Sequence, residues 1–358
     1  MSSEPVHRNL RLLLLGTFFL AFFAILYFMY FKSSTGWLSD PVHAIFPIGH
    51  VKDLFTKSNR SVTTVLAWVW RFEKRNNLNV CASQFNIDGC FITADRNLYN
   101  KSDGVVIRHR DIVSNLSNLP PIQRPSFQKW VWLNLESPAH IPHLDAVENL
   151  FNLTLSYRRD ADILVPFGSI VSNEGEDNFV LLSKNKLLCW IVSNWKQNFA
   201  RVKYYNELQK HIKVHGYGRA FNKSVDKQEY VSILTSCKFY LAFENSIQKD
   251  YITEKFYNPL GVGTVPVVLG PSRDDYEKAI QGDAFIHVED FASPKELADY
   301  LLFLDKNEDM YLKYFKWRRH FKVKKTQFWT EHMCLACDYL RRHRESQVVE
   351  NLNKWFWS

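Results

Sequence analysis

One stretch of the sequence decides the fold: residues 240–270 read YLAFENSIQKDYITEKFYNPLGVGTVPVVLG. The apolar run Phe239–Phe243 predicts a buried strand, Tyr251–Leu260 reads as a helix, and Val265–Leu269 predicts a second buried strand. Strands that alternate with helices are typical of parallel sheets. The polar residues between the first strand and the helix then lie at the carboxyl end of the sheet, where ligands bind in open α/β folds.

The same alternation continues on both sides of this stretch. Further strand-like segments are predicted at 62–70, 104–108, 130–135, 162–165, 187–193 and 212–217, and helices at 201–211 and 294–304. The polar residues 171–178 read as a linker. We therefore predict an α/β fold with two doubly wound domains, 62–168 and 169–326, which face a cleft. We expect a C-terminal segment, 327–358, to return to the first domain.

The composition supports a folded chain with an anionic ligand. Of its 358 residues, 46% are hydrophobic and 23% are charged, and the net charge is +8. These are globular values, and they exclude a mostly disordered chain. The mild basic excess allows an anionic small molecule, whereas the absence of a block of five or more like charges argues against nucleic acid as a partner.

A single apolar run near the N-terminus predicts a membrane anchor. Residues 12–31 read LLLLGTFFLAFFAILYFMYF, without a charge, which is long enough to span a bilayer. Arg8 and Arg11 precede the run and only Lys32 follows it closely, so residues 1–11 are predicted to be cytoplasmic. Residues 32–61 then form a stem. A cleaved signal peptide is the alternative, although its apolar region is usually shorter.

Cysteines and glycosylation signals agree with a lumenal location. The six cysteines are even in number and would pair in an oxidising lumen, with 15 connectivities open; a zinc site at Cys334 and Cys337 lacks a second pair of cysteines at that spacing. Asn-x-Ser/Thr sequons, which are candidates for N-glycosylation, occur at Asn59, Asn100, Asn115, Asn152 and Asn222.

The start of the predicted helix could bind a nucleotide diphosphate. Asp250 can cap this helix, and the free N–H groups of its first turn favour an anion. Lys255 adds charge there, Glu254 could accept hydrogen bonds from a ribose, and Arg201 offers a guanidinium group that matches phosphate geometry. A solvated helix start and an ordinary exposed arginine are the alternatives.

Two carboxylate motifs in the first domain deserve different interpretations. Glu136 ends the apolar strand WVWLNL, which makes it a candidate general base at the edge of a cleft. The motif Asp160-Ala161-Asp162 matches a metal-binding pattern, but one such triplet is expected by chance, so we assign it to structure.

Several long motifs resemble the α1,3-fucosyltransferase family. They are FQKWVWLNLESP, CWIVSNW followed by ARVKYYNEL, and the stretch CKFYLAFENSIQKDYITEKFYNPLGVGTVPVVLGPSRDDYEK, and the resemblance covers about residues 63–358. It implies a GT-B fold in which the first domain binds the acceptor and the second binds GDP-fucose. It further implies inverting transfer of L-fucose to the 3-hydroxyl of GlcNAc in type 2 N-acetyllactosamine (Lewis x synthesis), on glycoproteins and glycolipids.

The resemblance also assigns roles to residues. It implies that Glu136 is the catalytic base in contact with the acceptor, and that Arg110 is a further acceptor residue that goes with type 2 chains. Donor-site positions match Ile191, Ser193, Asn194, Arg201, Tyr240, Asn245, Tyr251, Glu254 and Lys255. The implied disulfides are Cys81–Cys334, Cys90–Cys337 and Cys189–Cys237. Two departures are notable: Lys74 stands where relatives have an acceptor-contacting Gln, and Phe167 replaces a Tyr near the donor.

The family further implies a single-pass type II protein of the Golgi membrane, with a homodimer possible and no cofactor or metal required. Two alternatives remain open at this point. The acceptor could instead be the core GlcNAc of N-glycans, which the acceptor surface around Lys74 and Arg110 would decide. A catalytically silent glycan-binding protein is the other alternative, and it would be expected to have lost Glu136, Arg201 or Lys255, all of which are present.

Overall fold

The computed structural model describes residues 62–68, 80–113, 116–121, 123–173, 179–280 and 283–358. Within these ranges, no helix combines the length and the apolar character that a membrane crossing requires. The predicted cytoplasmic tail, apolar span and stem lie outside the described residues, as do Asn59, Lys74 and Asn115.

The first sheet has six parallel strands in the order β2-β1-β3-β4-β5-β6. The strands are β1 Thr63–Trp68, β2 Cys90–Thr93, β3 Gly104–Arg108, β4 Lys129–Asn134, β5 Leu153–Ser156 and β6 Ile163–Leu164. Every residue of β4 is buried, because apolar clusters cover both faces of the sheet. Short helices α2 (Val80–Phe85) and α3 (His109–Ile112) complete the connections.

The second sheet has five parallel strands in the order β12-β11-β10-β8-β9. The strands are β8 Lys186–Ile191, β9 Val214–Tyr217, β10 Cys237–Phe243, β11 Val265–Leu269 and β12 Ile286–His287. The helices are α4 Ala200–Leu208, α5 Lys227–Ser236, α6 Glu254–Val262, α7 Arg273–Glu277, α8 Pro294–Lys306 and α9 Glu308–Leu312. The predicted α/β fold with parallel sheets is therefore confirmed, and β3 and β11 have the predicted limits.

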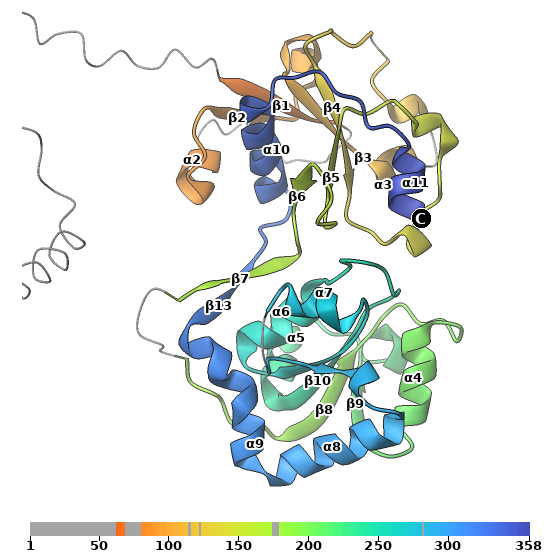
Figure 1. Ribbon diagram of the computed structural model, residues 1–358, viewed down its shortest axis with the longest axis vertical. Coiled ribbons are helices and arrows are strands. Elements are labelled where there is room, and N and C mark those ends of the chain that lie inside the picture. Colours follow the sequence, from red (N-terminus) through yellow and green to blue (C-terminus); the bar gives the residue numbers. More distant parts are fainter. Residues whose placement is uncertain (1–61, 69–79, 114–115, 122, 174–178, 281–282) are drawn as a thin grey trace, which may run out of the picture. The chain divides into compact units, whose positions relative to one another are not determined.

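A two-stranded ribbon connects the two sheets. Strand β7 (Gly168–Ser172) pairs with β13 (Phe321–Lys325) in antiparallel fashion, and the two run side by side in Figure 1. The prediction of an irregular linker at 171–178 is therefore wrong for Val171 and Ser172. The reason is that their backbone groups pair with a strand about 150 residues away in the sequence, which no local pattern reveals.

The chain after this ribbon packs on the first sheet. Helix α10 (Thr330–Arg342) contacts β1 and β2, and the ring of Phe356 in α11 (Leu352–Trp357) meets the ring of Trp132 in β4 at a centroid distance of 4.9 Å. Two disulfides attach α10, namely Cys81–Cys334 and Cys90–Cys337, and a third, Cys189–Cys237, joins β8 to β10. These three pairs match the connectivity that the family resemblance implied.

Candidate active site

The N-terminus of α6 is organised around a buried carboxylate. Glu244 follows β10, and its side chain is 0% exposed. Its Oε1 atom accepts a hydrogen bond from the Thr253 N–H at 2.8 Å, and the Thr253 hydroxyl lies 2.9 Å from both carboxylate oxygens. Burial raises the pKa of Glu244, an effect that the neighbouring Lys255 ammonium opposes. The N-cap of α6 is therefore tied to the end of β10.

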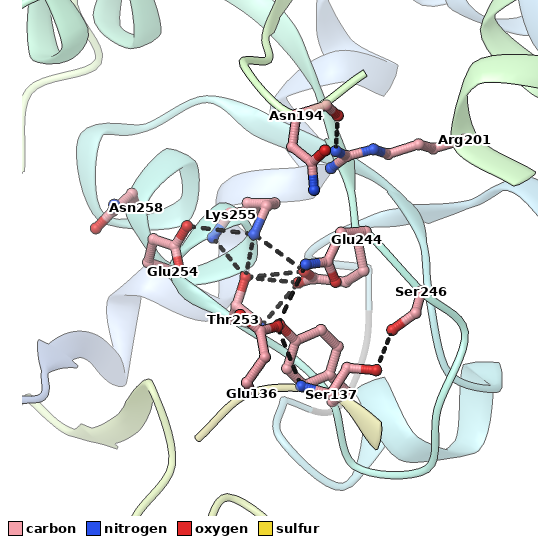
Figure 2. A network of polar contacts seen from close by, with 12 residues as sticks. Glu136, Ser137, Asn194, Arg201, Glu244, Ser246, Thr253, Glu254, Lys255 and Asn258 are labelled. Atoms are coloured by element: carbon pink, nitrogen blue, oxygen red, sulfur yellow. Dashed lines mark hydrogen bonds and ion pairs between the residues drawn. The ribbon is translucent and has the colours of Figure 1, made fainter. Parts of the chain in front are cut away.

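Lys255 lies in the first turn of α6 and contacts three protein oxygens. Its Nζ is 3.2 Å from Glu244 Oε2, 3.3 Å from Glu254 Oε1 and 2.9 Å from Thr253 Oγ1 (Figure 2). Burial acts to lower the pKa of Lys255, but the two carboxylates together raise it, so the ammonium stays charged. Because an ammonium group has three N–H donors, Lys255 must give up one of these contacts in order to bind a phosphate.

Arg201 lies in the first turn of α4 and is only 4% exposed. Its Nη2 donates to the carbonyl oxygen of Asn194 (Figure 2), and its buried Nε has no hydrogen-bond partner among the residues that the structure describes. Burial lowers the pKa of Arg201, whereas the charge of Glu244 raises it. A buried guanidinium nitrogen without a partner is ready to donate to an anionic ligand.

Glu136 stands two residues beyond the end of β4 and is half-buried. Its Oε1 atom accepts hydrogen bonds from the N–H of Ser137 at 3.1 Å and from the hydroxyl of Tyr251 at 2.9 Å, and a longer one from Asn245 Nδ2 at 3.4 Å. Tyr251 and Asn245 belong to the connection between β10 and α6, so the first and second sheets meet at this carboxylate.

Glu136 and Lys255 line one cavity of about 280 Å³. Its walls come from the ends of β3 and β4, the β10–α6 connection, the first turn of α6 and the segment before α10. The lining residues are Arg108, Arg110, Leu133, Asn134, Leu135, Glu136, Phe167, Asn245, Tyr251, Thr253, Glu254, Lys255, Phe328 and Trp329. The cavity is therefore at the carboxyl ends of parallel strands, which is the usual ligand site of open α/β sheets.

Of the residues predicted for the site, the structure brings six together in this lining: Arg110, Glu136, Asn245, Tyr251, Glu254 and Lys255. The other five predicted residues do not line it: Ile191, Ser193, Asn194, Arg201 and Tyr240. Arg201 nevertheless lies near enough to Glu244 and Tyr251 to interact with them electrostatically. Tyr240 lies in the core, and its hydroxyl is 3.5 Å from the carbonyl oxygen of Ile191.

Among the lining or supporting residues that the sequence reasoning missed are Asn134, Glu244, Phe328 and Trp329. Glu244 was visible as the first polar residue after an apolar strand, at the carboxyl end of the sheet, but no role was predicted for its carboxylate. Phe328 and Trp329 lie about 190 residues after Glu136 in the chain, and only the return of the C-terminal segment brings them to the cavity. No sequence pattern indicated that contact.

Two predictions about α6, its N-cap and its first residue, need correction. Thr253, and not Asp250, caps α6, and the helix begins at Glu254. Asp250 has φ +61°, and its carboxylate is occupied by the backbone N–H and the guanidinium of Arg159. Asn152, one of the candidates for glycosylation, is buried, and its Nδ2 donates to the carbonyl oxygen of Gln347 at 2.7 Å.

The other sequons within the described residues lie on the surface, and the Asp-x-Asp motif is a structural feature. Asn100 and Asn222 are exposed. Asp160 forms an ion pair with Arg158, and Asp162 Oδ2 accepts hydrogen bonds from the N–H and the hydroxyl of Thr154. Both carboxylates of the motif therefore have structural partners. Within the part of the chain that the structure describes, no group of three or more His, Cys, Asp or Glu side chains is placed to hold a metal ion.

Comparison with protein families now adds an independent observation. Residues 60–168 match the model described as fucosyltransferase, N-terminal, and residues 181–355 match glycosyltransferase family 10 (fucosyltransferase) C-term. The chain belongs to glycosyltransferase family 10, the fucosyltransferases. The two matches together cover well over half of the chain, and the matched residues include the elements that form the cavity.

Individual relatives agree with this membership. The chain is 51% identical over 351 residues to the human 4-galactosyl-N-acetylglucosaminide 3-alpha-L-fucosyltransferase 9, covering 98% of each chain. It is 44% identical over 307 residues to the 3-galactosyl-N-acetylglucosaminide 4-alpha-L-fucosyltransferase FUT3 of Pan troglodytes, covering 84% of this chain and 82% of that one. A crystal structure of an alpha1,3-fucosyltransferase has a similar fold, with a TM-score of 0.50 and 17% identity over 82% of this chain and 93% of that chain.

Proposed function

We propose that the protein transfers L-fucose from GDP-β-L-fucose to the 3-hydroxyl of GlcNAc in type 2 N-acetyllactosamine, with inversion at the fucose anomeric carbon. The observation that carries the proposal is the cavity in which Glu136 faces the first turn of α6. One wall thus supplies a carboxylate, and the other supplies a helix N-terminus with a lysine. The name of the human relative, which is half identical to this chain, supports the same donor sugar and linkage.

The chemistry follows from these two walls. As the acceptor oxygen attacks the anomeric carbon of fucose, Glu136 takes the proton of the acceptor hydroxyl as general base. The bond between that carbon and the β-phosphate oxygen breaks, and GDP leaves with the electron pair. The transition state has oxocarbenium character, as in glycoside hydrolysis, so negative charge grows on the departing diphosphate while positive charge grows on the sugar.

Arg201, Lys255 and the N–H groups at the start of α6 are suited to stabilise that negative charge. The unpartnered Nε of Arg201 can donate without losing a protein contact. Lys255 exchanges a contact with Glu244 or Glu254 for one with phosphate. Glu254, whose side chain is 46% exposed, remains available for the ribose hydroxyls. With two protein cations at the leaving group, we expect activity without an added metal.

We propose that residues of the first domain select the acceptor. Arg110 lies in α3, is exposed and lines the cavity together with Arg108, so it can contact an acceptor that reaches Glu136. We propose type 2 lactosamine as the preferred acceptor. The relatives of this chain carry names for both the 4-galactosyl and the 3-galactosyl acceptor, and this makes acceptor type the most informative property to measure.

We also propose the borders and the location predicted from the sequence. The acceptor domain is 62–168, the donor domain is 169–326, and the protein is a type II protein of the Golgi membrane anchored by residues 12–31. The uncharged run of residues 12–31, preceded by two arginines, supports the anchor. Partners are then GDP-fucose and lactosamine-bearing glycoproteins and glycolipids at the lumenal face.

The full chain, purified in detergent, provides the test. It is incubated with GDP-fucose and type 1, type 2 or chitobiose acceptors, with and without EDTA. We expect fucose on the type 2 acceptor in both conditions. Transfer only to chitobiose would replace the acceptor assignment, loss of activity in EDTA would contradict metal independence, and no transfer to any acceptor would contradict the enzyme assignment.

Glu136→Gln tests the role of the base. This variant keeps the size of the side chain, so we expect an intact fold and unchanged GDP binding, with transfer to the type 2 acceptor abolished. GDP affinity is measured by calorimetry and transfer by mass spectrometry of the glycan. Normal turnover by Glu136→Gln would place the general base on another residue.

A further inference from the structure

The backbone of Glu136 is held by a side chain from its own strand. Asn134, the last residue of β4, is 3% exposed. Its Oδ1 accepts a hydrogen bond from the N–H of Glu136 at 3.1 Å, and its Nδ2 donates to the carbonyl oxygen of Glu136 at 3.0 Å. Because one amide side chain satisfies both backbone groups of Glu136, the Cα of the carboxylate has a defined place relative to the sheet.

The two oxygens of the Glu136 carboxylate have different surroundings. Oε1 accepts from the Ser137 N–H, from the Tyr251 hydroxyl and, at a longer distance, from Asn245 Nδ2. Oε2 has no hydrogen-bond partner among the residues that the structure describes. A carboxylate anchored by one oxygen keeps the other free to accept a proton.

Tyr251 is itself rigidly placed. Its side chain is 3% exposed, its ring lies 5.0 Å from that of Tyr157, and it meets the ring of Phe167 edge-on at 6.2 Å. Burial raises the pKa of Tyr251, and the nearby carboxylates of Glu244 and Glu136 add to this. The hydroxyl therefore stays protonated and donates to Glu136.

We propose that Tyr251 is a positioning residue for the base: it anchors Oε1 of Glu136, so that Oε2 receives the proton of the acceptor hydroxyl. This inference rests on the proposed function, and it adds a contact with the base to the donor-site position that the family resemblance gives to Tyr251. It explains how the second sheet controls a base that the first sheet carries. Two residues after Tyr251, Thr253 caps the helix at which the diphosphate is proposed to bind.

The placement of Tyr251 links the two halves of the site. One short connection, from Glu244 to Thr253, carries both the hydrogen bond to the base and the N-cap of α6. A general base acts when it lies within about 2.6–3.2 Å of the oxygen that carries the proton, or reaches that oxygen through one water. A displacement of about 1 Å can cost about 100-fold in rate. Loss of the Tyr251 hydroxyl should therefore lower turnover without removing any group that holds GDP.

The experiment compares Tyr251→Phe with Tyr157→Phe in the full chain. Both variants lose one hydroxyl from adjacent buried rings, but only Tyr251 contacts Glu136. For Tyr251→Phe we expect kcat for the type 2 acceptor to fall about 10- to 100-fold, with the dissociation constant of GDP within about twofold of the wild type. Tyr157→Phe should keep kcat within about twofold, and both variants should melt near the wild-type temperature.

Three results would each overturn the role proposed for Tyr251. An unchanged kcat in Tyr251→Phe overturns it, because the hydroxyl is then dispensable for the base. A weaker affinity for GDP also overturns it, whatever happens to kcat, because Tyr251 then acts by holding the nucleotide. An equal loss of kcat in Tyr157→Phe makes the effect one of ring packing and overturns it as well. Failure of the proposed function is distinguishable, because the wild-type chain itself would then transfer no fucose.

Discussion

Removing the two disulfides of α10, separately and together, should reveal strong coupling between them. Cys81–Cys334 and Cys90–Cys337 span 253 and 247 residues of sequence, respectively. While one of these disulfides is intact, the other closes only a short loop. This loop consists of the segment from Cys81 to Cys90 and the segment from Cys334 to Cys337, which together have roughly a dozen residues. In the chain-entropy model, a loop of about 12 residues is worth about 3 kcal/mol, and one of about 250 residues about 5.5 kcal/mol.

The magnitudes follow from these loop lengths. Replacing either pair by alanines should lower the free energy of unfolding by about 3 kcal/mol, because the remaining disulfide still attaches α10 to the first sheet. Replacing both pairs should cost about 8 kcal/mol, which exceeds the sum of the single effects by about 2–3 kcal/mol. The loss also reaches the cavity, because Phe328 and Trp329 immediately precede α10.

The assay is urea-induced unfolding followed by tryptophan fluorescence, since the chain has 11 Trp. Cys189–Cys237 is the matched control. It closes a loop of 48 residues between β8 and β10, so its removal should cost about 4 kcal/mol and add independently to the removal of either α10 disulfide. If the loss of both α10 disulfides costs no more than the sum of the single losses, the loop-closure reasoning is refuted.

Two further predictions concern charge. Arg201→Ala and Lys255→Ala should each lower the transfer rate or the affinity for GDP-fucose by orders of magnitude, and full activity in either variant would contradict a role at the diphosphate. Burial lowers the pKa of His332 to about 4, so the unfolded chain binds more protons than the folded chain between pH 6.5 and 4. The free energy of unfolding therefore falls as the pH drops through this window, by about 3 kcal/mol in total. Urea titrations at several pH values check this, and His332→Gln should flatten the pH dependence; an unchanged slope in that variant would contradict the assignment.

The polar network at α6 illustrates how far local patterns reach. The sequence predicted a helix near Tyr251–Leu260 and an anion site at its start, because capping residues, helix spacing and charge are local properties. The cap was assigned to Asp250, three residues too early, because Asp and Thr are both good N-caps and the choice depended on Glu244 and Arg159. Residues distant in sequence therefore decided between two locally acceptable helix starts.

By itself, the sequence determined the alternation of strands and helices, the buried runs of β3, β4, β10 and β11, and the candidate residues Glu136, Glu254 and Lys255, whereas β2, β5, β12 and α5 were not predicted. Periodicity and strand-end polarity are read from neighbouring residues, so these features need no tertiary information. Only the tertiary structure decided that β7 pairs with β13, that Phe328 and Trp329 reach the cavity, and that Tyr251 holds Glu136. Those contacts join segments roughly 100 to 200 residues apart, and they form because the packing of two sheets, not any local preference, brings the segments together.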